Sequence, residues 1–280
     1  MKRIALAAVL ITAALPLAAQ QGPLRTPRPS QKQIITQTVG VTDITINYSR
    51  PGVKGRAIWG ALVPYDKVWR TGANEATTIQ FSDDVTINGE KLPKGTYSLH
   101  TIPSQNEWTI IFNKVADQWG SYSYDEKSDA LRVKAKPEKS DFREWLSFEF
   151  PQISADQATV AIRWENVSVP FTVNTDSVNK TIASIKKAMA NSKNDAWRLP
   201  YMAAQTAFDA GMTSADATQW IDDSIKANEN ISNLWLKARM QAKAGNVVEA
   251  RKTANAALAK ATPEQSDFAN EIKRQMGEWK

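Results

Sequence analysis

The stretch DVTINGEKLPKGTYSLHTI, residues 84–102, sets the architecture of the first half of the chain. Asn88-Gly89 is the dipeptide favoured in a two-residue β-hairpin, because both central positions of a type I′ turn need a positive φ. In the run TYSLHTI, Tyr97 and Leu99 share one face of an extended strand, and polar side chains occupy the other. We therefore expect a strand, a tight turn and a half-buried strand of an antiparallel sheet.

Similar runs recur on both sides of this stretch, between Ile34 and Val173. They include IITQTV, VTDITINYS, ATTIQFS, EWTIIFN, ALRVKAK, WLSFEF, TVAIRW and SVPFTV, and turn residues separate most of them. Strands that recur roughly every 8–12 residues, with no helical pattern between them, are typical of antiparallel sandwiches and barrels. Residues 31–175 are therefore predicted to form an antiparallel β-sandwich or an open barrel.

The remainder of the chain has a helical, alanine-rich pattern. Ile182 and Ile185 begin a helix face. Gly211 and Gly245 are separated by the tetratricopeptide period of about 34 residues. The segment NLWLKARMQAKAGNVVEARKTANAAL, residues 233–258, resembles one tetratricopeptide repeat, with small residues where two helices approach closely.

These patterns predict an α+β multidomain chain. The β-sandwich is followed by a short all-α, tetratricopeptide-like domain over residues 176–280. A degenerate copy precedes the repeat at residues 233–258, around MAAQTAFDAGMTSADATQWIDDSI. Two repeats and their flanking helices are too few for a free-standing solenoid, so we expect the helices to dock on the sandwich.

The chain begins MKRIALAAVLITAALPLAAQ, in which two cations precede an apolar run and then small residues. This layout predicts a secretory signal peptide over residues 1–19 and export to the periplasm or the cell exterior. Residues 20–30, QGPLRTPRPS and the glutamine before them, contain three prolines and are predicted to form an extended arm or linker. We expect no membrane span after the signal is removed.

Composition excludes several classes of function. The formal net charge is +6, and basic residues are interleaved with acidic ones, so the concentrated phosphate-binding surface of a nucleic-acid-binding protein is missing. The chain has no cysteine and one histidine, which excludes thiolate metal sites and sites built on several imidazoles. We predict neither cofactor nor metal. Calcium near Asp125–Asp129 stays an open alternative, although the spacing is not that of an EF-hand loop.

The stretch between Arg50 and Glu75 is the principal candidate site, because long loops inside compact domains are either functional or packed by their own side chains. Its candidate ligand-binding residues are Arg50, Arg56, Trp59, Tyr65, Trp69, Arg70, Asn74 and Glu75. In a structural interpretation, Trp59 and Trp69 fill one end of the sandwich and Arg70 pairs with Glu75. In a functional interpretation, the aromatic faces and arginines line a concave site for a small molecule, glycan or peptide.

A catalytic alternative uses two carboxylates. Glu75 with Asp125, or with Glu126 or Asp129 in its place, would act as acid and base of a hydrolase if the fold held them across a cleft. His100 is the only imidazole available as a base, but we expect it at the surface, on the polar face of its strand. Arg132 and the lysines that alternate with it are expected on an edge strand, where such charges block edge-to-edge pairing.

The first part of the chain, over about residues 28–173, closely resembles the bacterial domain-of-unknown-function family 2911. The resemblance is carried by the arm TPRPSQKQ, by SRPGVKGRAIWGALVPYDKVWRTGANEATT and by DQWGSYSYDEKSDALRVKAKPEK. It implies an exported, mostly β domain of envelope-associated bacterial proteins, often followed by repeat-like helices, with no established activity. His100 departs from the family's pattern, in which an aromatic residue is expected.

We therefore interpret the chain as an exported, non-catalytic binding or scaffold protein of the cell envelope. Its ligand would bind at the 50–75 loop, and the helical domain would offer a second face to a protein partner. The alternative is a hydrolase acting on carbohydrate or another envelope polymer.

Overall fold

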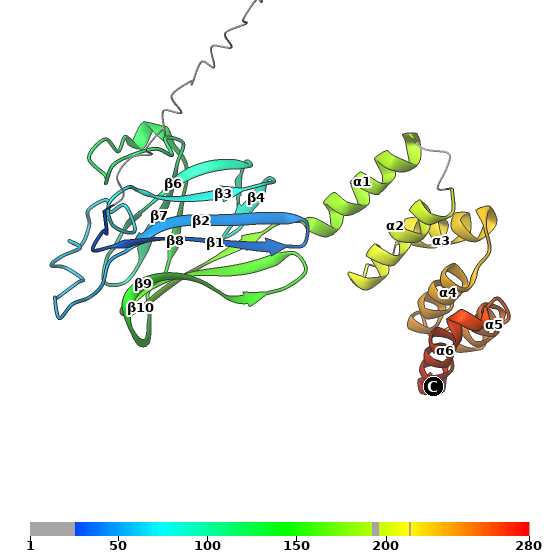
Figure 1. Cartoon of the computed structure of the whole chain (residues 1–280). Coiled ribbons are helices and arrows are strands. Elements are labelled where there is room, and N and C mark those ends of the chain that lie inside the picture. The colour runs from blue at the N-terminus through cyan, green and yellow to red at the C-terminus, as the bar shows by residue number, and fades with distance from the viewer. Residues whose placement is uncertain (1–25, 192–195, 213, 280) are drawn as a thin grey trace, which may run out of the picture.

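The computed structural model describes residues 26–191, 196–212 and 214–279. The predicted signal peptide and the first residues of the arm lie outside these ranges. The described chain folds into two antiparallel sheets followed by a series of helices (Figure 1). The α+β architecture predicted from the sequence is confirmed.

The two sheets form a sandwich. One has six strands in the order β1-β2-β3-β6-β7-β8, and the other has four in the order β5-β4-β10-β9. The strands are β1 Gln31–Val39, β2 Thr42–Arg50, β3 Thr77–Phe81, β4 Val85–Ile87, β5 Glu90–Leu92, β6 Gly95–Ile102, β7 Trp108–Asn113, β8 Asp129–Ala135, β9 Glu138–Ile153 and β10 Gln157–Asn174.

The predicted hairpin is present between β4 and β5. Ile87 pairs with Glu90, and Asn88 and Gly89 between them have φ values of 49° and 91°, as a type I′ turn requires. Tyr97 and Leu99 of β6 point into the core between the sheets, as their alternation predicts.

The β2–β3 connection, residues 51–76, closes one side of the sandwich. Its first residues pair with the edge strand of the other sheet, because the backbone N–H of Val53 donates to the Glu144 carbonyl and the Leu146 N–H donates to the Pro51 carbonyl. These bonds tie the connection to β9 and hold it across the gap between the sheets.

The helices are α1 Ser177–Asn191, α2 Arg198–Asp209, α3 Ala215–Ala227, α4 Ile231–Lys243, α5 Val247–Leu258 and α6 Ser266–Glu278. They pack in sequential pairs, with the small residues Ala204, Ala238, Ala250 and Ala257 fully buried at the contacts. Gly211 and Gly245 follow α2 and α4 and have positive φ values. Helices commonly end in this left-handed conformation, which glycine adopts without steric strain.

The helices do not dock on the sandwich as expected. Figure 1 shows α2–α6 beyond the end of the sheets. The first turn of α1 makes the connection: Ser177 Oγ donates to the Val39 carbonyl at 3.0 Å, and the Val178 N–H donates to Asp156 Oδ1 at 3.0 Å. The physical reason is that the helices cover one another's apolar faces. Trp235, for example, is buried and stacks on Trp279 at 5.5 Å.

Candidate functional site

A cluster of four tryptophans fills the end of the sandwich beneath the 51–76 connection. Trp59 and Trp69 come from the connection, Trp108 from β7 and Trp164 from β10. The rings of Trp69 and Trp164 stack at 5.9 Å, and Trp59 meets Trp108 edge-on at 5.0 Å. Trp108 and Trp164 are buried, whereas the two connection tryptophans are only partly covered. The connection therefore plugs the core, as the structural interpretation predicts, and leaves part of two indoles accessible.

A cavity of about 240 Å³ opens beside this cluster. We call it the Arg–Trp cavity; it is lined chiefly by Ser30, Arg56, Leu62, Trp69, Arg70 and Trp164. Two guanidinium groups thus share one small space with two stacked indoles. Neither arginine forms an ion pair with an acidic residue among the described parts of the chain.

Arg70, one of the residues that line this cavity, carries an unsatisfied donor. Its Nε atom is buried and has no hydrogen-bond acceptor within the described structure. Its Nη1 atom reaches the neighbouring segment of residues 114–128, where a Cβ placed on Gly120 would lie 3.2 Å away. Gly120 has a φ of 67° and gives the guanidinium room that a side chain would remove.

The predicted pair between Arg70 and Glu75 is wrong. Glu75 Oε1 instead accepts from Arg28 Nη1 at 2.6 Å, and this hydrogen bond holds the pKa of the Glu75 carboxyl below its ordinary value. Arg28 and Glu75 are far apart in the sequence, so no local sequence pattern predicts this pair. The arm runs across the connection, where Asn74 Nδ2 also donates to the Ser30 carbonyl at 3.1 Å.

The other predicted ligand residues hold the connection rather than the cavity. Arg50 Nε donates to the Leu146 carbonyl at 2.8 Å. Arg56 lines the cavity, but its Nε and Nη2 donate to the backbone carbonyls of Val53 and Gly52. Tyr65 packs over Gly60, where a Cβ would come within 2.8 Å of its ring. The structure therefore brings Arg56, Trp69 and Arg70 together, and places Arg50, Tyr65, Asn74 and Glu75 around them.

His100 is not at the surface as expected. Residues 114–128 fold over the outer face of β6–β8, and His100 beneath them has no exposed area. Its ring lies 5.1 Å from that of Tyr124, neither ring nitrogen has a hydrogen-bond partner in the described structure, and burial lowers its pKa to about 4. An imidazole so enclosed has no access to a substrate in this conformation.

A polar network accompanies His100. The Tyr124 hydroxyl donates to Asp129 Oδ2 at 2.7 Å and accepts from Arg132 Nη2 at 2.6 Å. Burial raises the pKa of Tyr124 to about 12. Sequence reasoning missed this network, because its members are joined only when the 114–128 segment folds back on the sheet.

The carboxylates of the catalytic and calcium alternatives are engaged elsewhere. Asp125 Oδ1 accepts from the Lys127 N–H and caps the 3₁₀ turn Glu126–Ser128. Asp129 accepts from Asn113, Tyr124 and Arg132. Within the described residues, no group of three or more histidine and acidic side chains is placed to hold a metal ion. Arg132 and Lys134 do lie on an edge strand, β8, as predicted.

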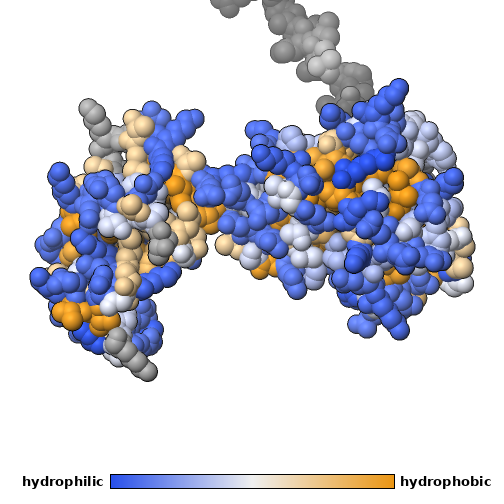
Figure 2. All heavy atoms as spheres, turned by 180° about the vertical axis from the view of Figure 1, so that it is seen from behind, coloured by the Kyte–Doolittle hydropathy of each residue, from blue (hydrophilic) through white to orange (hydrophobic). Residues whose placement is uncertain are grey.

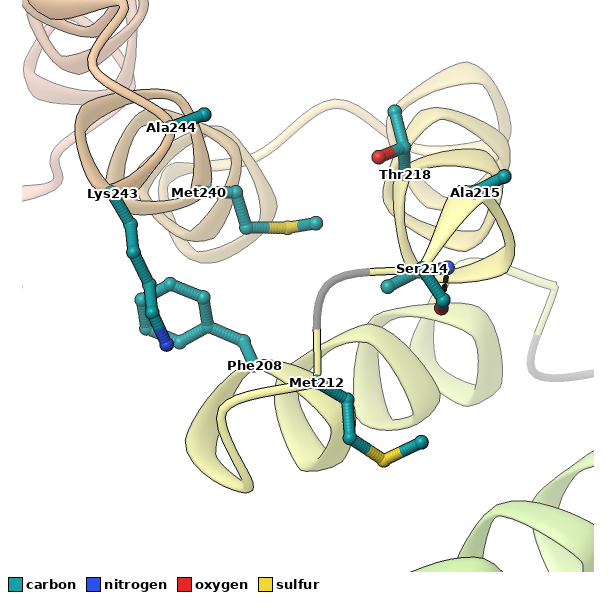
Figure 3. A pocket seen from close by; sticks show the side chains of 9 residues that line it. Phe208, Met212, Ser214, Ala215, Thr218, Met240, Lys243 and Ala244 are labelled. Atoms are coloured by element: carbon teal, nitrogen blue, oxygen red, sulfur yellow. Dashed lines mark hydrogen bonds between the residues drawn. The ribbon is translucent and has the colours of Figure 1, made fainter.

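A second, more apolar hollow of about 290 Å³ lies between α2, α3 and α4 (Figure 3). Phe208, Met212 and Met240 form its walls, and Lys243 lies at its rim with Nζ 5.0 Å from the Phe208 ring. Figure 2 shows hydrophobic surface between the hydrophilic residues of both parts of the molecule.

The fold and site together define a class of protein: a two-sheet antiparallel β-sandwich closed by a long tryptophan-rich connection and extended by a helical array. The family model described as protein of unknown function (DUF2911) matches residues 30–173, and the chain belongs to this family. No curated protein and no solved structure matches the chain. Of the helices that the structure describes, none is both long enough and apolar enough to cross a membrane.

Proposed function

We propose that the protein is an exported, non-catalytic binding protein of the cell envelope, and that the Arg–Trp cavity holds a small anionic ligand with a flat or apolar body. The observation that carries the proposal is the buried Nε of Arg70, which has no acceptor in the described structure. The N-terminal sequence pattern supports export.

The energetics favour an anion. A buried donor without a partner costs roughly 1–3 kcal/mol, and more when the group is charged. A carboxylate in the cavity would accept from Arg70 and offset one of the two positive charges that Arg56 and Arg70 bring to the cavity, with charge-assisted hydrogen bonds stronger than neutral ones. The partly covered indole of Trp69, which stacks on the buried Trp164, would contact the rest of the ligand, as in other sites that combine aromatic walls with a few polar groups.

The ligand classes with this chemistry are an acidic sugar, a peptide carboxylate or a free organic acid. The hydrolase alternative has less support, because Glu75 is bound by Arg28 and Asp125 caps a turn. A carboxylate already engaged by an arginine has a lowered pKa and is a poor proton donor.

The test is a titration with benzoate, indole-3-acetate, glucuronate and inorganic phosphate, followed by tryptophan fluorescence and calorimetry. We expect saturable binding of at least one carboxylate. Arg70→Met removes the charge but keeps the apolar stem, so it should weaken binding about tenfold or more, the loss expected for a charge-assisted bond. Arg143→Met is the matched control, because Arg143 lies outside the cavity, at the surface beside Glu149, and its loss should leave affinity unchanged. Equal binding by wild type and Arg70→Met would contradict the proposal, as would no saturable binding of any probe.

The helical part is proposed to bind a protein partner. The hollow formed by Phe208, Met212 and Met240 offers the adaptable apolar surface that methionine-lined sites provide. Peptides selected for binding to the intact wild-type protein should bind the Met240→Asp variant much more weakly. Peptides that bind wild type and variant equally would show that the partner binds outside this hollow.

A further inference from the structure

The sandwich has four sheet edges, and three of them are protected against pairing with another strand. β5 has only three residues. β8 lies beside β5, carries Arg132 and Lys134, and has the Lys134 carbonyl bound by Asn88 Nδ2 at 2.8 Å. β9 is interrupted by register shifts and is covered by the start of the 51–76 connection. Short, charged, irregular or covered strands are the usual means by which proteins keep sheet edges from associating.

β1, the fourth edge, has none of these protections. It has nine residues, QKQIITQTV, with no proline and a single charge at Lys32. It pairs with β2 in continuous register from Gln31 to Val39, and no other described strand pairs with it. Ile34 on its outer face is 59% exposed. A long, regular and nearly neutral edge with an exposed isoleucine is a template for pairing with another strand.

The turn that follows β1 fixes which backbone groups face outward. Gly40 and Val41 form a two-residue turn closed by the pair Val39 and Thr42, and the closing pair of such a hairpin is hydrogen-bonded. Because hydrogen-bonded pairs alternate along an antiparallel ladder, the odd-numbered residues of β1 bond to β2. The even-numbered ones, Lys32, Ile34, Thr36 and Thr38, direct their N–H and C=O groups away from the sheet. The bond from Gln37 Nε2 to the Thr38 carbonyl, at 2.8 Å, agrees with this assignment.

We infer that β1 pairs antiparallel with β1 of a second copy of the chain, about a two-fold axis at Ile35. In this register the outward-facing residues form hydrogen-bonded pairs: Ile34 opposite Thr36 of the second copy, and Lys32 opposite its Thr38. Ile35, half-buried on the inner face, lies opposite itself and continues the apolar layer across the axis. The two sheets become one continuous sheet.

A second copy is the occupant that the edge itself favours. The register centred on Ile35 overlaps the whole of β1 with its equal, brings no like charges together, and covers both copies of Ile34. It also satisfies every outward-facing backbone group of the strand at once. A two-fold contact of this kind is self-complementary, as an isologous dimer requires.

Sedimentation velocity on the purified protein over a range of concentrations tests the inference, with two double variants that carry the same number of substitutions. In Ile34→Lys with Thr36→Lys, each lysine at 34 faces a lysine at 36 of the other copy, and the dimer should be lost. In Ile34→Lys with Thr36→Glu, each lysine faces a glutamate, and the dimer should persist. Far-UV circular dichroism and thermal melting confirm that both fold.

Ile153→Lys is the control for an added surface charge, because Ile153 is 50% exposed at the end of β9 and should leave the dimer intact. Thr36→Pro gives an independent readout. It removes an outward N–H without removing a bond to β2, so it should yield a folded monomer. A wild-type protein that is monomeric at all concentrations would overturn the inference. So would a dimer that survives the two-lysine variant, or one that is lost equally in both double variants.

Discussion

Arg28 Nη1 lies 2.6 Å from Glu75 Oε1, and this ion pair fastens the N-terminal arm across the connection that carries the Arg–Trp cavity. Both side chains are about half exposed. Ser30, two residues further along the arm, lines the cavity itself. The arm therefore forms part of the cavity wall, and the pair that holds it is a surface contact.

Arg28→Ala should change the free energy of unfolding by less than about 1 kcal/mol, as for other exposed pairs. It should also reduce the acid sensitivity of the fold. The Glu75 pKa is lowered in the folded state, so the pair's contribution is present above the ordinary carboxyl pKa and is lost as the pH falls through the lowered one. Chemical denaturation of wild type and variant at neutral and acidic pH measures this. A larger loss at pH 7 would show that the arm is a structural element of the sandwich.

Trp69→Ala should destabilise the protein by about 3–5 kcal/mol, because it removes an indole that stacks on Trp164 and packs against the core. Arg70→Met should not destabilise the protein in this way. The guanidinium of Arg70 has a buried donor without an acceptor, and methionine puts an apolar side chain in its place. The free energy of unfolding should therefore stay within about 1 kcal/mol of wild type or rise. Urea denaturation midpoints decide both. A large loss of stability in Arg70→Met would mean that this guanidinium stabilises the connection and is not available to bind a ligand.

The stability of the sandwich should depend on pH through His100. Its pKa is about 4 in the folded protein, against an ordinary value of 6.5 for the unfolded chain. Between these values the unfolded chain binds the proton and the folded one does not. Stability is therefore full above about pH 6.5 and falls by up to about 3 kcal/mol as the pH approaches 4.

His100→Phe removes this titration and keeps an aromatic ring beside Tyr124. The variant should show a flatter pH profile than wild type between pH 6.5 and 4, with equal or greater stability at the acidic end. Denaturation midpoints at closely spaced pH values provide the comparison. Parallel profiles for the two proteins would place the acid sensitivity in other groups.

Local sequence signals predicted much of the fold and little of the site. The strand alternation at Tyr97 and Leu99 and the Asn88-Gly89 turn depend on neighbouring residues alone, so the sequence contains them. The partner of Glu75 and the burial of His100 depend on segments far along the chain that fold over the sheet. Alternation predicted correctly that His100 faces away from the core, but only the folded 114–128 segment makes that face an interior.

The helical part provides the last prediction. The sequence favoured helices that need the sandwich, but the structure gives them a core of their own around Trp235, Ala254 and Ile272. Their connection to the sheets is confined largely to the first turn of α1. A fragment of residues 176–280 should therefore melt cooperatively by circular dichroism, because its buried contacts are made within the fragment. Trp235→Ala should lower its midpoint strongly, as loss of a buried indole costs about 3–5 kcal/mol. Ser177→Ala should change it little, since the bonds of the Ser177 hydroxyl in the described structure go to Val39, Val41 and Thr175, which lie outside the fragment. A broad, non-cooperative transition of the unmodified fragment would show that the short junction at α1 supplies stability that the helix pairs lack.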